Sequence, residues 1–232
     1  MLSRLAPVDA ASRVPDRGAV APKAGEAGYA LMQLPKHITA AGEAIVEMDD
    51  RAHQALRPHR GSTIAGALDL LGKIGDQPQL RTISAALLAA GTFAGSDRLV
   101  RAGARMMIAH EAATLSKDQV KNRIDRVRPR TAKDPSDKKP RKGEHRSKEM
   151  TSFPSGHSAG AMAVTRAFSR EFPEYAAPAL ALGTIVAGVQ VPRRAHYPTD
   201  ILAGMLLGIA AEAVVHAAWS AAGMNERSSS ER

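Results

Sequence analysis

Apolar residues recur at helical spacing along most of the chain, and segments rich in Pro, Gly or charge separate the apolar stretches. The first amphipathic stretch runs from His37 to about Leu56 and carries too many charges to span a bilayer. Its candidate buried positions are Ile38, Ile45, Met48 and Leu56. The pattern predicts a helix that turns these apolar side chains toward a core.

Further helical stretches follow at 62–73, 80–95, 99–115, 159–168, 176–191 and 201–219. Together they predict an all-α fold, a helical bundle of about five or six helices within a domain over residues 37–222. A membrane span needs roughly 20 apolar residues. Residues 201–219 come nearest, broken only by Glu212 and His216. We favour a membrane-embedded bundle, and a soluble bundle with alanine-rich buried helices is the alternative.

The two ends and one internal segment lack this periodicity. Residues 1–36 are rich in Pro, Gly, Ala and charge, which predicts a flexible leader, and the first twenty lack the apolar run of a cleavable signal peptide. Residues 121–149 are dense in charge, and we expect 131–149 to form an exposed basic loop. The polar residues 223–232 predict a disordered tail.

Composition narrows the function further. The 232 residues suit one domain with a core, and the absence of cysteine excludes disulfides and thiolate metal sites. A net charge of +9 favours an anionic partner such as a lipid head group, a phosphate ester or nucleic acid. Aromatic residues make up only 3%, so the stacking platforms of single-stranded nucleic-acid binders are scarce. We therefore expect no nucleic-acid partner.

The stretch Pro154-Ser155-Gly156-His157 stands directly before the central apolar run. Ser155 is a good N-cap residue, so the free backbone N–H groups of a helix N-terminus would lie here and favour an anion. Gly156 allows close backbone approach, and His157 can carry a proton near neutral pH. Taken alone, the stretch is also an ordinary helix cap.

Two more groups of polar residues flank this stretch. Lys121 and Arg128 are seven residues apart, about two helical turns, so we expect them to share one helix face and grip a dianion together. Downstream, Asp200 follows His196 by four residues where a helix starts, and its carboxylate can fix the tautomer of the ring. Alone, these would be a solvated basic face and a surface histidine beside a helix-start charge.

In this order the three motifs, Lys-x6-Arg-Pro, Pro-Ser-Gly-His and His-x3-Asp, resemble those of the type 2 phosphatidic acid phosphatase (PAP2) superfamily. That superfamily includes membrane lipid phosphatases, polyprenyl diphosphate phosphatases, soluble bacterial acid phosphatases and vanadium haloperoxidases. The matching core covers about residues 60 to 219. The resemblance implies a metal-independent phosphatase without a cofactor, whose substrate is a lipid phosphate or polyprenyl (di)phosphate.

The resemblance also assigns roles to single residues. His196 would attack phosphorus and form a phosphohistidine, Asp200 would orient His196, and His157 would protonate the departing oxygen. Four groups would hold the phosphate oxygens: Lys121, Arg128, Ser155 and the backbone N–H of Gly156.

One position departs from the family pattern. The arginine that the family places six residues before the second histidine is Gln190 here. Arg193 and Arg194 are alternative candidates for the missing cation. A soluble or peripheral acid phosphatase of the same superfamily, or a weakly active or non-catalytic anion-binding member, are therefore the other hypotheses.

The resemblance implies a multi-pass protein of the cell membrane with its site facing away from the cytoplasm. The basic segment 121–149 argues for the opposite orientation, because positively charged loops tend to stay in the cytoplasm. We follow the resemblance.

Overall fold

The computed structural model describes residues 36–56, 63–143 and 147–224, without the side chains of residues 36–41 and 135. The predicted leader and tail lie outside these ranges, apart from Lys36 and residues 223–224. The chain divides into two units, Met1–Gly42 and Glu43–Arg232. In the first unit only the start of helix α2 (Lys36–Ala55) is described. All other helices and strands belong to the second unit.

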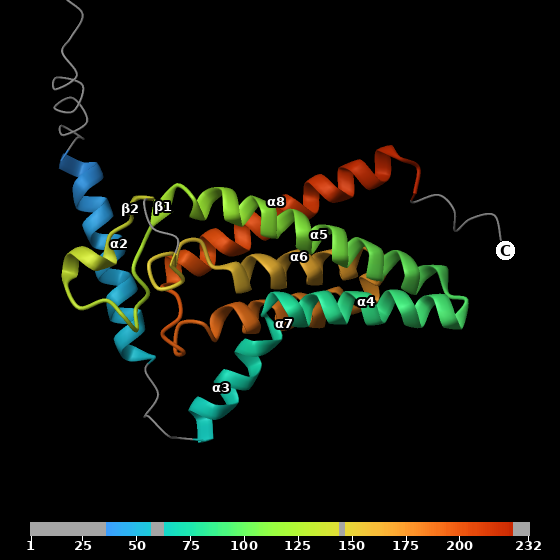
Figure 1. Ribbon diagram of the computed structural model, residues 1–232, viewed down its shortest axis with the longest axis horizontal. Helices are drawn as coiled ribbons and strands as arrows, with labels where there is room; N and C mark the ends of the chain where they lie inside the picture. The colour runs from blue at the N-terminus through green and yellow to red at the C-terminus, as the bar shows by residue number, and fades with distance from the viewer. Residues whose placement is uncertain (1–35, 57–62, 144–146, 225–232) are drawn as a thin grey trace, which may run out of the picture. The chain divides into compact units, whose positions relative to one another are not determined.

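The second unit is helical, which confirms the predicted all-α fold (Figure 1). After α2, the helices of the described residues are α3 (Thr63–Ile74), α4 (Gln77–Ala94), α5 (Asp97–Lys121), α6 (Gly156–Glu171), α7 (Ala176–Gly188) and α8 (Pro198–Ala221). They bring the α-helix total of these residues to seven, against the five or six expected. Each apolar stretch of the sequence corresponds to one of them.

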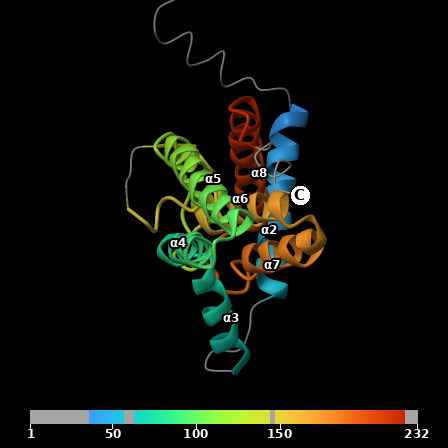
Figure 2. The ribbon, with the colours of Figure 1, turned by 90° about the vertical axis from the view of Figure 1, so that its right-hand side faces the viewer.

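Helix α6 is the centre of the bundle. It packs against α4, α5, α7 and α8, and Figure 2 shows these four helices around it. Its buried side chains are mostly small, which lets four neighbours approach one helix. The main apolar core lies between α4, α5, α6 and α8 and consists of Leu80, Met106, Ala109, Ala113, Ala159, Ala163, Val164, Ala167 and Ala211.

Two glycines of α8 allow backbone contact with the start of α6. A Cβ atom added to Gly204 would lie 2.3 Å from the Ser155 carbonyl oxygen, and one added to Gly208 would lie 2.2 Å from that of Ala159. In addition, the Ser155 N–H donates to the Asp200 carbonyl, 2.9 Å away. The start of α8 is thereby fixed beside the start of α6.

The predicted common helix face of Lys121 and Arg128 is wrong. Helix α5 ends at Lys121, and the chain continues as strand β1 (Ile124–Asp125), which pairs antiparallel with β2 (Arg141–Lys142). Beyond β1, the Arg128 N–H donates to the carbonyl of Glu149 at 2.9 Å. The segment is extended because it finds these hairpin partners. The described side chains of 131–149 are exposed or half-buried, whereas those of 125–129 are buried.

The predicted burial of α2 is also wrong. Ile45, Met48 and Leu56 are 47%, 52% and 55% exposed, whereas Asp49 and His53 on the polar side are buried. The side chain of Ile38 is outside the described residues. The polar side of α2 faces inward because buried polar groups elsewhere in the second unit bind it.

Candidate active site

A cavity of about 620 Å³ lies where the ends of α4, α5 and α6 meet the segment before α8. Five of the predicted site residues line it, namely Lys121, Arg128, Gly156, His157 and His196. They come from three segments that are far apart in the sequence. The bundle therefore brings all three motifs to one hollow at one end of the helices.

The two histidines face each other in this cavity. The centroids of the His157 and His196 rings are 5.9 Å apart, and the ring planes are inclined by 65°. His157 is in the first turn of α6, and His196 is two residues before α8. At this separation the two rings can flank one phosphorus atom.

The surroundings of His196 define which ring nitrogen carries the proton. The Arg128 Nη1 group lies 3.3 Å from His196 Nε2. A guanidinium can only donate, so Nε2 is the acceptor and the proton is on Nδ1. Burial lowers the pKa of His196 to about 3, although the Asp200 carboxylate acts in the opposite direction. His196 is therefore neutral at physiological pH, with a lone pair on Nε2.

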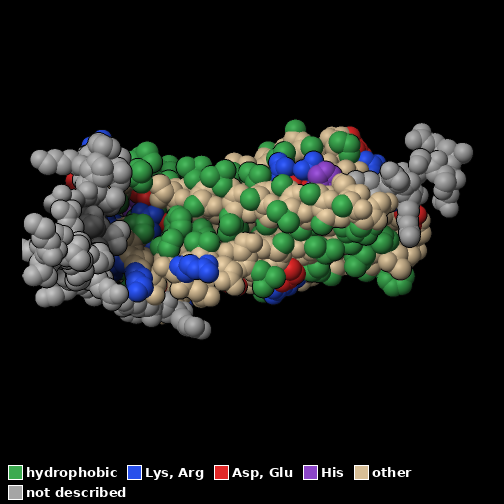
Figure 3. All heavy atoms as spheres, turned by 90° about the horizontal axis from the view of Figure 1, so that it is seen from above, with side chains coloured by type: hydrophobic (Ala, Val, Ile, Leu, Met, Phe, Trp, Pro, Cys, Tyr) green, Lys and Arg blue, Asp and Glu red, His purple; other side chains and the backbone are tan. Residues whose placement is uncertain are grey.

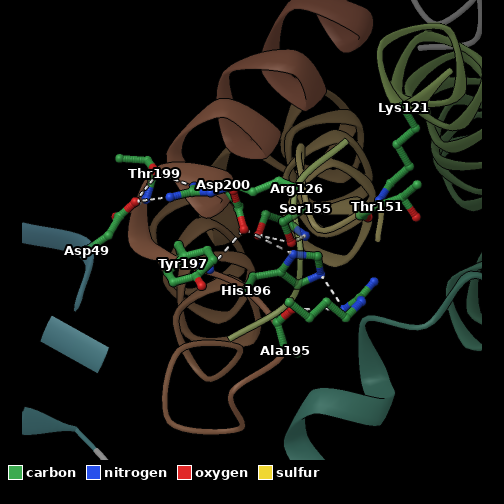
Figure 4. A network of polar contacts seen from close by, with 12 residues as sticks. Asp49, Lys121, Arg126, Thr151, Ser155, Ala195, His196, Tyr197, Thr199 and Asp200 are labelled. Atoms are coloured by element: carbon green, nitrogen blue, oxygen red, sulfur yellow. Dashed lines mark hydrogen bonds and ion pairs between the residues drawn. The ribbon is translucent and has the colours of Figure 1, made fainter. Parts of the chain in front are cut away.

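The Asp200 carboxylate lies beside the Nδ1 side of His196. The distance between His196 Nδ1 and Asp200 Oδ2 is 3.8 Å, which is longer than a hydrogen bond (Figure 4). The carboxylate accepts from the Tyr197 N–H at 2.9 Å and from Arg126 Nη1 at 2.6 Å. Asp200 is thus rigidly held next to the ring that it is predicted to orient.

A buried ionic network extends from Asp200 and was missed in the sequence. Arg126 also binds Asp49 of α2, with 2.7 Å between Nη2 and Oδ2, and donates to the Thr199 hydroxyl at 2.8 Å. Figure 4 shows these contacts of Arg126 with the two carboxylates. Asp49 and Asp200 are fully buried, and Arg126 is 2% exposed. In the sequence, the position of Arg126 between Lys121 and Arg128 was a weak sign of a role in the site. No feature of the sequence indicated a role for Asp49.

Backbone carbonyls hold the two predicted cations in place. The Lys121 ammonium donates to the Thr151 carbonyl, and Arg128 donates to the carbonyls of Lys148 (2.7 Å) and Ala195 (2.9 Å). Burial lowers the pKa of Lys121 to about 7, and the charges of Arg128 and Lys117 add to this effect. Both side chains are oriented before an anion arrives.

Two further lysines line the cavity, Lys117 and Lys148, and the motifs do not include them. Lys117 is 8% exposed and forms an ion pair with Asp118 at 2.7 Å. A Cβ atom added to Gly156 would lie 3.0 Å from Lys117 Cδ, so this lysine lies against the start of α6. Lys117 precedes Lys121 by one helical turn, and this spacing was a signal in the sequence from which its place beside Lys121 could have been predicted.

The acid candidate His157 has an unexpected carboxylate partner. His157 Nε2 lies 2.6 Å from Oδ1 of Asp76, which immediately precedes α4 and also lines the cavity. Burial lowers the pKa of His157 below its usual value, and the Asp76 carboxylate opposes this effect without cancelling it.

The predicted phosphate ligand Ser155 does not line the cavity. Its side chain is fully buried, and its hydroxyl oxygen accepts from the N–H and the hydroxyl of Ser158, at 3.3 Å and 2.8 Å. Ser155 is therefore the N-cap of α6, in agreement with the interpretation of its motif as an ordinary helix cap.

The two alternative arginines do not line the cavity either. Arg193 donates to Asp69 at 2.9 Å and to the Gln190 side-chain oxygen at 3.0 Å. Arg194 donates to His53 at 3.2 Å and to the Pro129 carbonyl at 3.1 Å. In this structure neither guanidinium takes the place of the arginine expected at Gln190.

In the described part of the chain, no group of three or more His, Cys, Asp or Glu side chains is arranged to hold a metal ion. One helix there, α8, is long and apolar enough to cross a membrane.

Comparisons with known proteins agree with the geometry. The model of the PAP2 superfamily matches residues 99–223, and no curated protein matches the chain. The fold is similar to the crystal structure of a transmembrane PAP2 type phosphatidylglycerolphosphate phosphatase from Bacillus subtilis, with 21% sequence identity and a TM-score of 0.57. The match covers 82% of this chain and 90% of that one. Since the family model spans more than half of its residues, the chain belongs to the PAP2 superfamily.

Proposed function

We propose that the chain is a phosphatase that hydrolyses a lipid phosphate or polyprenyl (di)phosphate at a membrane surface, through a phosphohistidine at His196. The observation that carries this proposal is the pair of histidines 5.9 Å apart in one cavity that four cationic side chains line. The four are Lys117, Lys121, Arg128 and Lys148. A site of this kind stabilises the negative charge of a phosphoryl group during transfer.

In the first step, the Nε2 lone pair of His196 attacks phosphorus and the bond to the leaving oxygen breaks. His157 gives its proton to that oxygen, so the alcohol leaves as a neutral molecule. The Nδ1 proton of His196 stays on the ring, and the Asp200 carboxylate at 3.8 Å stabilises the positive charge that develops there. Arg128, whose Nη1 lies 3.3 Å from Nε2, is placed to bind an oxygen of the same phosphoryl group.

In the second step, water attacks the phosphohistidine. Neutral His157 accepts a proton from the water as the new oxygen–phosphorus bond forms, and the nitrogen–phosphorus bond breaks. Inorganic phosphate leaves, His196 is again neutral, and His157 again carries its proton. Fixed cations supply the charge stabilisation in both steps, so the reaction is expected to proceed without added metal.

A lysine from α5, Lys117, is a candidate to replace the arginine that the family has at position 190. Lys117 is buried against the start of α6, where a phosphate at the helix N-terminus would lie. The Gln190 amide, in turn, is fully buried and accepts from Arg193. We propose that Lys117 supplies the third cation of the phosphate cradle, so that the substitution at Gln190 does not abolish activity.

The exposed apolar side chains of the bundle support the proposal that the protein lies in a membrane. Large apolar side chains are exposed on the outward faces of the helices, and Figure 3 shows hydrophobic side chains spread along one long side. Only 28% of the apolar window of α8 is buried, whereas the core helix of a soluble protein would be mostly covered. We propose that the bundle lies in the bilayer, with α8 as its most apolar span, and that the cavity opens at the bilayer surface.

A second, apolar cavity supports a lipid substrate. It has a volume of about 760 Å³, lies between α4, α6 and α7, and is lined almost entirely by carbon. One end includes Ile74 and Val186, and a Cβ atom added to Gly75 would touch both Val186 (2.6 Å) and His157 (3.5 Å). The apolar cavity therefore begins beside the catalytic histidines and can take a hydrocarbon chain.

Phosphate release from detergent-solubilised lipid phosphates tests the proposal. We expect release without added metal from at least one of phosphatidate, phosphatidylglycerophosphate or a polyprenyl phosphate. His196→Ala should abolish it, while His216→Ala near the far end of α8 serves as the matched control. Turnover that survives His196→Ala would refute the mechanism. Anion binding without release from any substrate would favour the non-catalytic alternative.

The side of the membrane is a separate proposal, that the cavity faces away from the cytoplasm. Since the chain contains no cysteine, single cysteines give clean accessibility data. In intact cells, an impermeant maleimide should label Ser136→Cys at the cavity end and should fail to label Ala94→Cys at the α4–α5 turn. The reverse pattern would put the basic segment 121–149 in the cytoplasm.

A further inference from the structure

We infer that Asp76 is a positioning residue for the acid His157, so that each of the two histidines has its own carboxylate. This inference rests on the proposed phosphatase function. Asp76 belongs to none of the three motifs and lies on the turn between α3 and α4. It would hold the acid ring in one orientation and favour its protonated form.

The contact defines both the tautomer and the orientation of His157. A carboxylate can only accept, so the 2.6 Å contact means that Nε2 of His157 carries a proton. A Cβ atom added to the neighbouring Gly75 would lie 3.5 Å from Cβ and Cδ2 of His157. The Cδ2–Nε2 edge of the ring therefore runs along the Gly75–Asp76 turn. The opposite edge, with Nδ1, is turned away from it.

A structural role does not account for Asp76. Its side chain occupies the N-cap position of α4 but makes no capping hydrogen bond. A carboxylate in an anion-binding cavity repels the substrate, and the other one there, Asp118, is neutralised by Lys117 at 2.7 Å. Among the described contacts, His157 is the side-chain partner of Asp76. The Asp76 carboxylate repels an anionic substrate, and its presence in this cavity is explained if it orients His157 and favours the protonated ring.

The proton transfers balance with Asp76 as a hydrogen-bond acceptor throughout. Protonated His157 carries N–H groups on both nitrogens and gives the Nδ1 proton to the leaving oxygen as the oxygen–phosphorus bond breaks. The ring is then the neutral Nε2–H tautomer, which Asp76 already binds. In the second step Nδ1 accepts a proton from the attacking water, and the protonated ring is restored.

The other charges around His157 make such a partner necessary. Burial and the neighbouring cations favour the neutral ring, whereas Asp76 favours the charged one. Besides Asp76, the charged and titratable groups that line this cavity or act on the charge of the ring are Lys117, Asp118, Lys121, Arg128, Lys148, Arg193 and His196. Without Asp76, His157 would lose its proton at a lower pH and would be a poorer proton donor at neutral pH.

The test compares two substrates that need the acid to different degrees. An alkyl phosphate has a poor leaving group, whereas p-nitrophenyl phosphate releases a stable anion without protonation. For Asp76→Asn we expect kcat for the alkyl ester to fall about 10- to 100-fold, a part of the range for general acid catalysis. The loss for the aryl ester should be less than about threefold, and the alkaline limb of the kcat profile should move to lower pH.

Two comparison variants interpret the result. His157→Ala should lose more kcat for the alkyl ester, which needs His157 in both steps, than for the aryl ester, which needs it in the second step alone. Asp118→Asn, which also removes a negative charge from the cavity, should alter KM for both esters alike. Equal losses of kcat for both esters in Asp76→Asn, or an alkaline limb that does not move, would overturn the inference. A KM that falls with kcat unchanged would reduce Asp76 to a repulsive charge.

A direct titration keeps this test separate from the test of the function. The imidazole signal of His157 can be followed by NMR against pH in the wild type and in Asp76→Asn. We expect the midpoint of the variant to be lower, and an unchanged midpoint would overturn the inference even in a chain without activity. Failure of the proposed function would appear instead as absent phosphate release from the wild type.

Discussion

Arg126 is a buried cation that connects Asp200, at the start of α8, with Asp49 of α2. Its guanidinium binds Asp200 at 2.6 Å and Asp49 at 2.7 Å, and it lies 4.0 Å above the centre of the Tyr197 ring. Asp49 in turn accepts from the N–H of Thr199 at 3.0 Å. Both carboxylates are fully buried, so water cannot replace the guanidinium. Removal of Arg126 therefore leaves two buried negative charges without their counter-ion.

The cost of the Arg126→Met substitution follows from this geometry. Removal of one partner from a buried ion pair costs about 3–5 kcal/mol, and Arg126 serves two carboxylates. A typical domain has a free energy of unfolding of about 5–15 kcal/mol, so the loss would be a large part of the whole. We expect the variant to unfold at a much lower temperature. Any folded fraction should have low activity, because Asp200 loses one of its anchors.

Thermal unfolding of the detergent-solubilised protein measures this loss. The matched control is Arg123→Met, since Arg123 is exposed and donates to the Gln119 carbonyl one turn before it. The control should change the free energy of unfolding by less than about 0.5 kcal/mol. The double variant Arg126→Met/Asp49→Asn should be more stable than the sum of the single losses, with a coupling of about 0.5–3 kcal/mol.

The reasoning would be refuted by an Arg126→Met variant that unfolds together with the Arg123→Met control. Strict additivity in the double variant would show that Asp49 does not depend on Arg126 for its counter-charge.

Three other predictions test separate parts of the account. Because burial and nearby cations lower the pKa of Lys121 to about 7, its charge is lost as pH rises through that value, and KM should rise above pH 7. The arginine of Lys121→Arg stays protonated, so the rise of KM with pH should be smaller in this variant. Identical dependences of KM on pH in the wild type and the variant would contradict this prediction. Gly208→Val should cost about 1–3 kcal/mol or more in thermal unfolding, because its Cβ atom would lie 2.2 Å from the Ala159 carbonyl oxygen; an unchanged transition would be inconsistent with this close packing. Ala179→Trp should fill the apolar cavity and reduce turnover of long-chain but not short-chain phosphates, compared with the exposed control Ala177→Trp. Equal turnover of both chain lengths would argue against a hydrocarbon chain in that cavity.

The helices were predictable because their signals are local. Apolar periodicity and small residues at 159–168 indicated a buried helix, and α6 is the helix that four others surround. The three motifs were also readable, since each stands beside a helix end and helix ends are where free backbone groups and polar side chains gather. The convergence of Lys121, Arg128, His157 and His196 came from the family resemblance.

What the sequence did not reveal depends on partners that are distant along the chain. Asp49 looks like a charge on the polar side of an amphipathic helix, and only the folded chain supplies Arg126 as its partner. The same contact turns the polar side of α2 inward and leaves Ile45 and Met48 exposed. The proposed role of Asp76 likewise depends on its contact with His157, which lies 81 residues further along the chain.

In the proposed mechanism, the two histidines act on one phosphorus atom, with His196 as the nucleophile. The most direct measurement is to quench the reaction with a radiolabelled substrate and map the label on the protein. We expect an acid-labile, alkali-stable phosphohistidine on the peptide that contains His196, absent in His196→Ala and, with an aryl phosphate as the substrate, in larger amount in His157→Ala. Label that persists in His196→Ala, or turnover with no labelled protein under any quench condition, would contradict it.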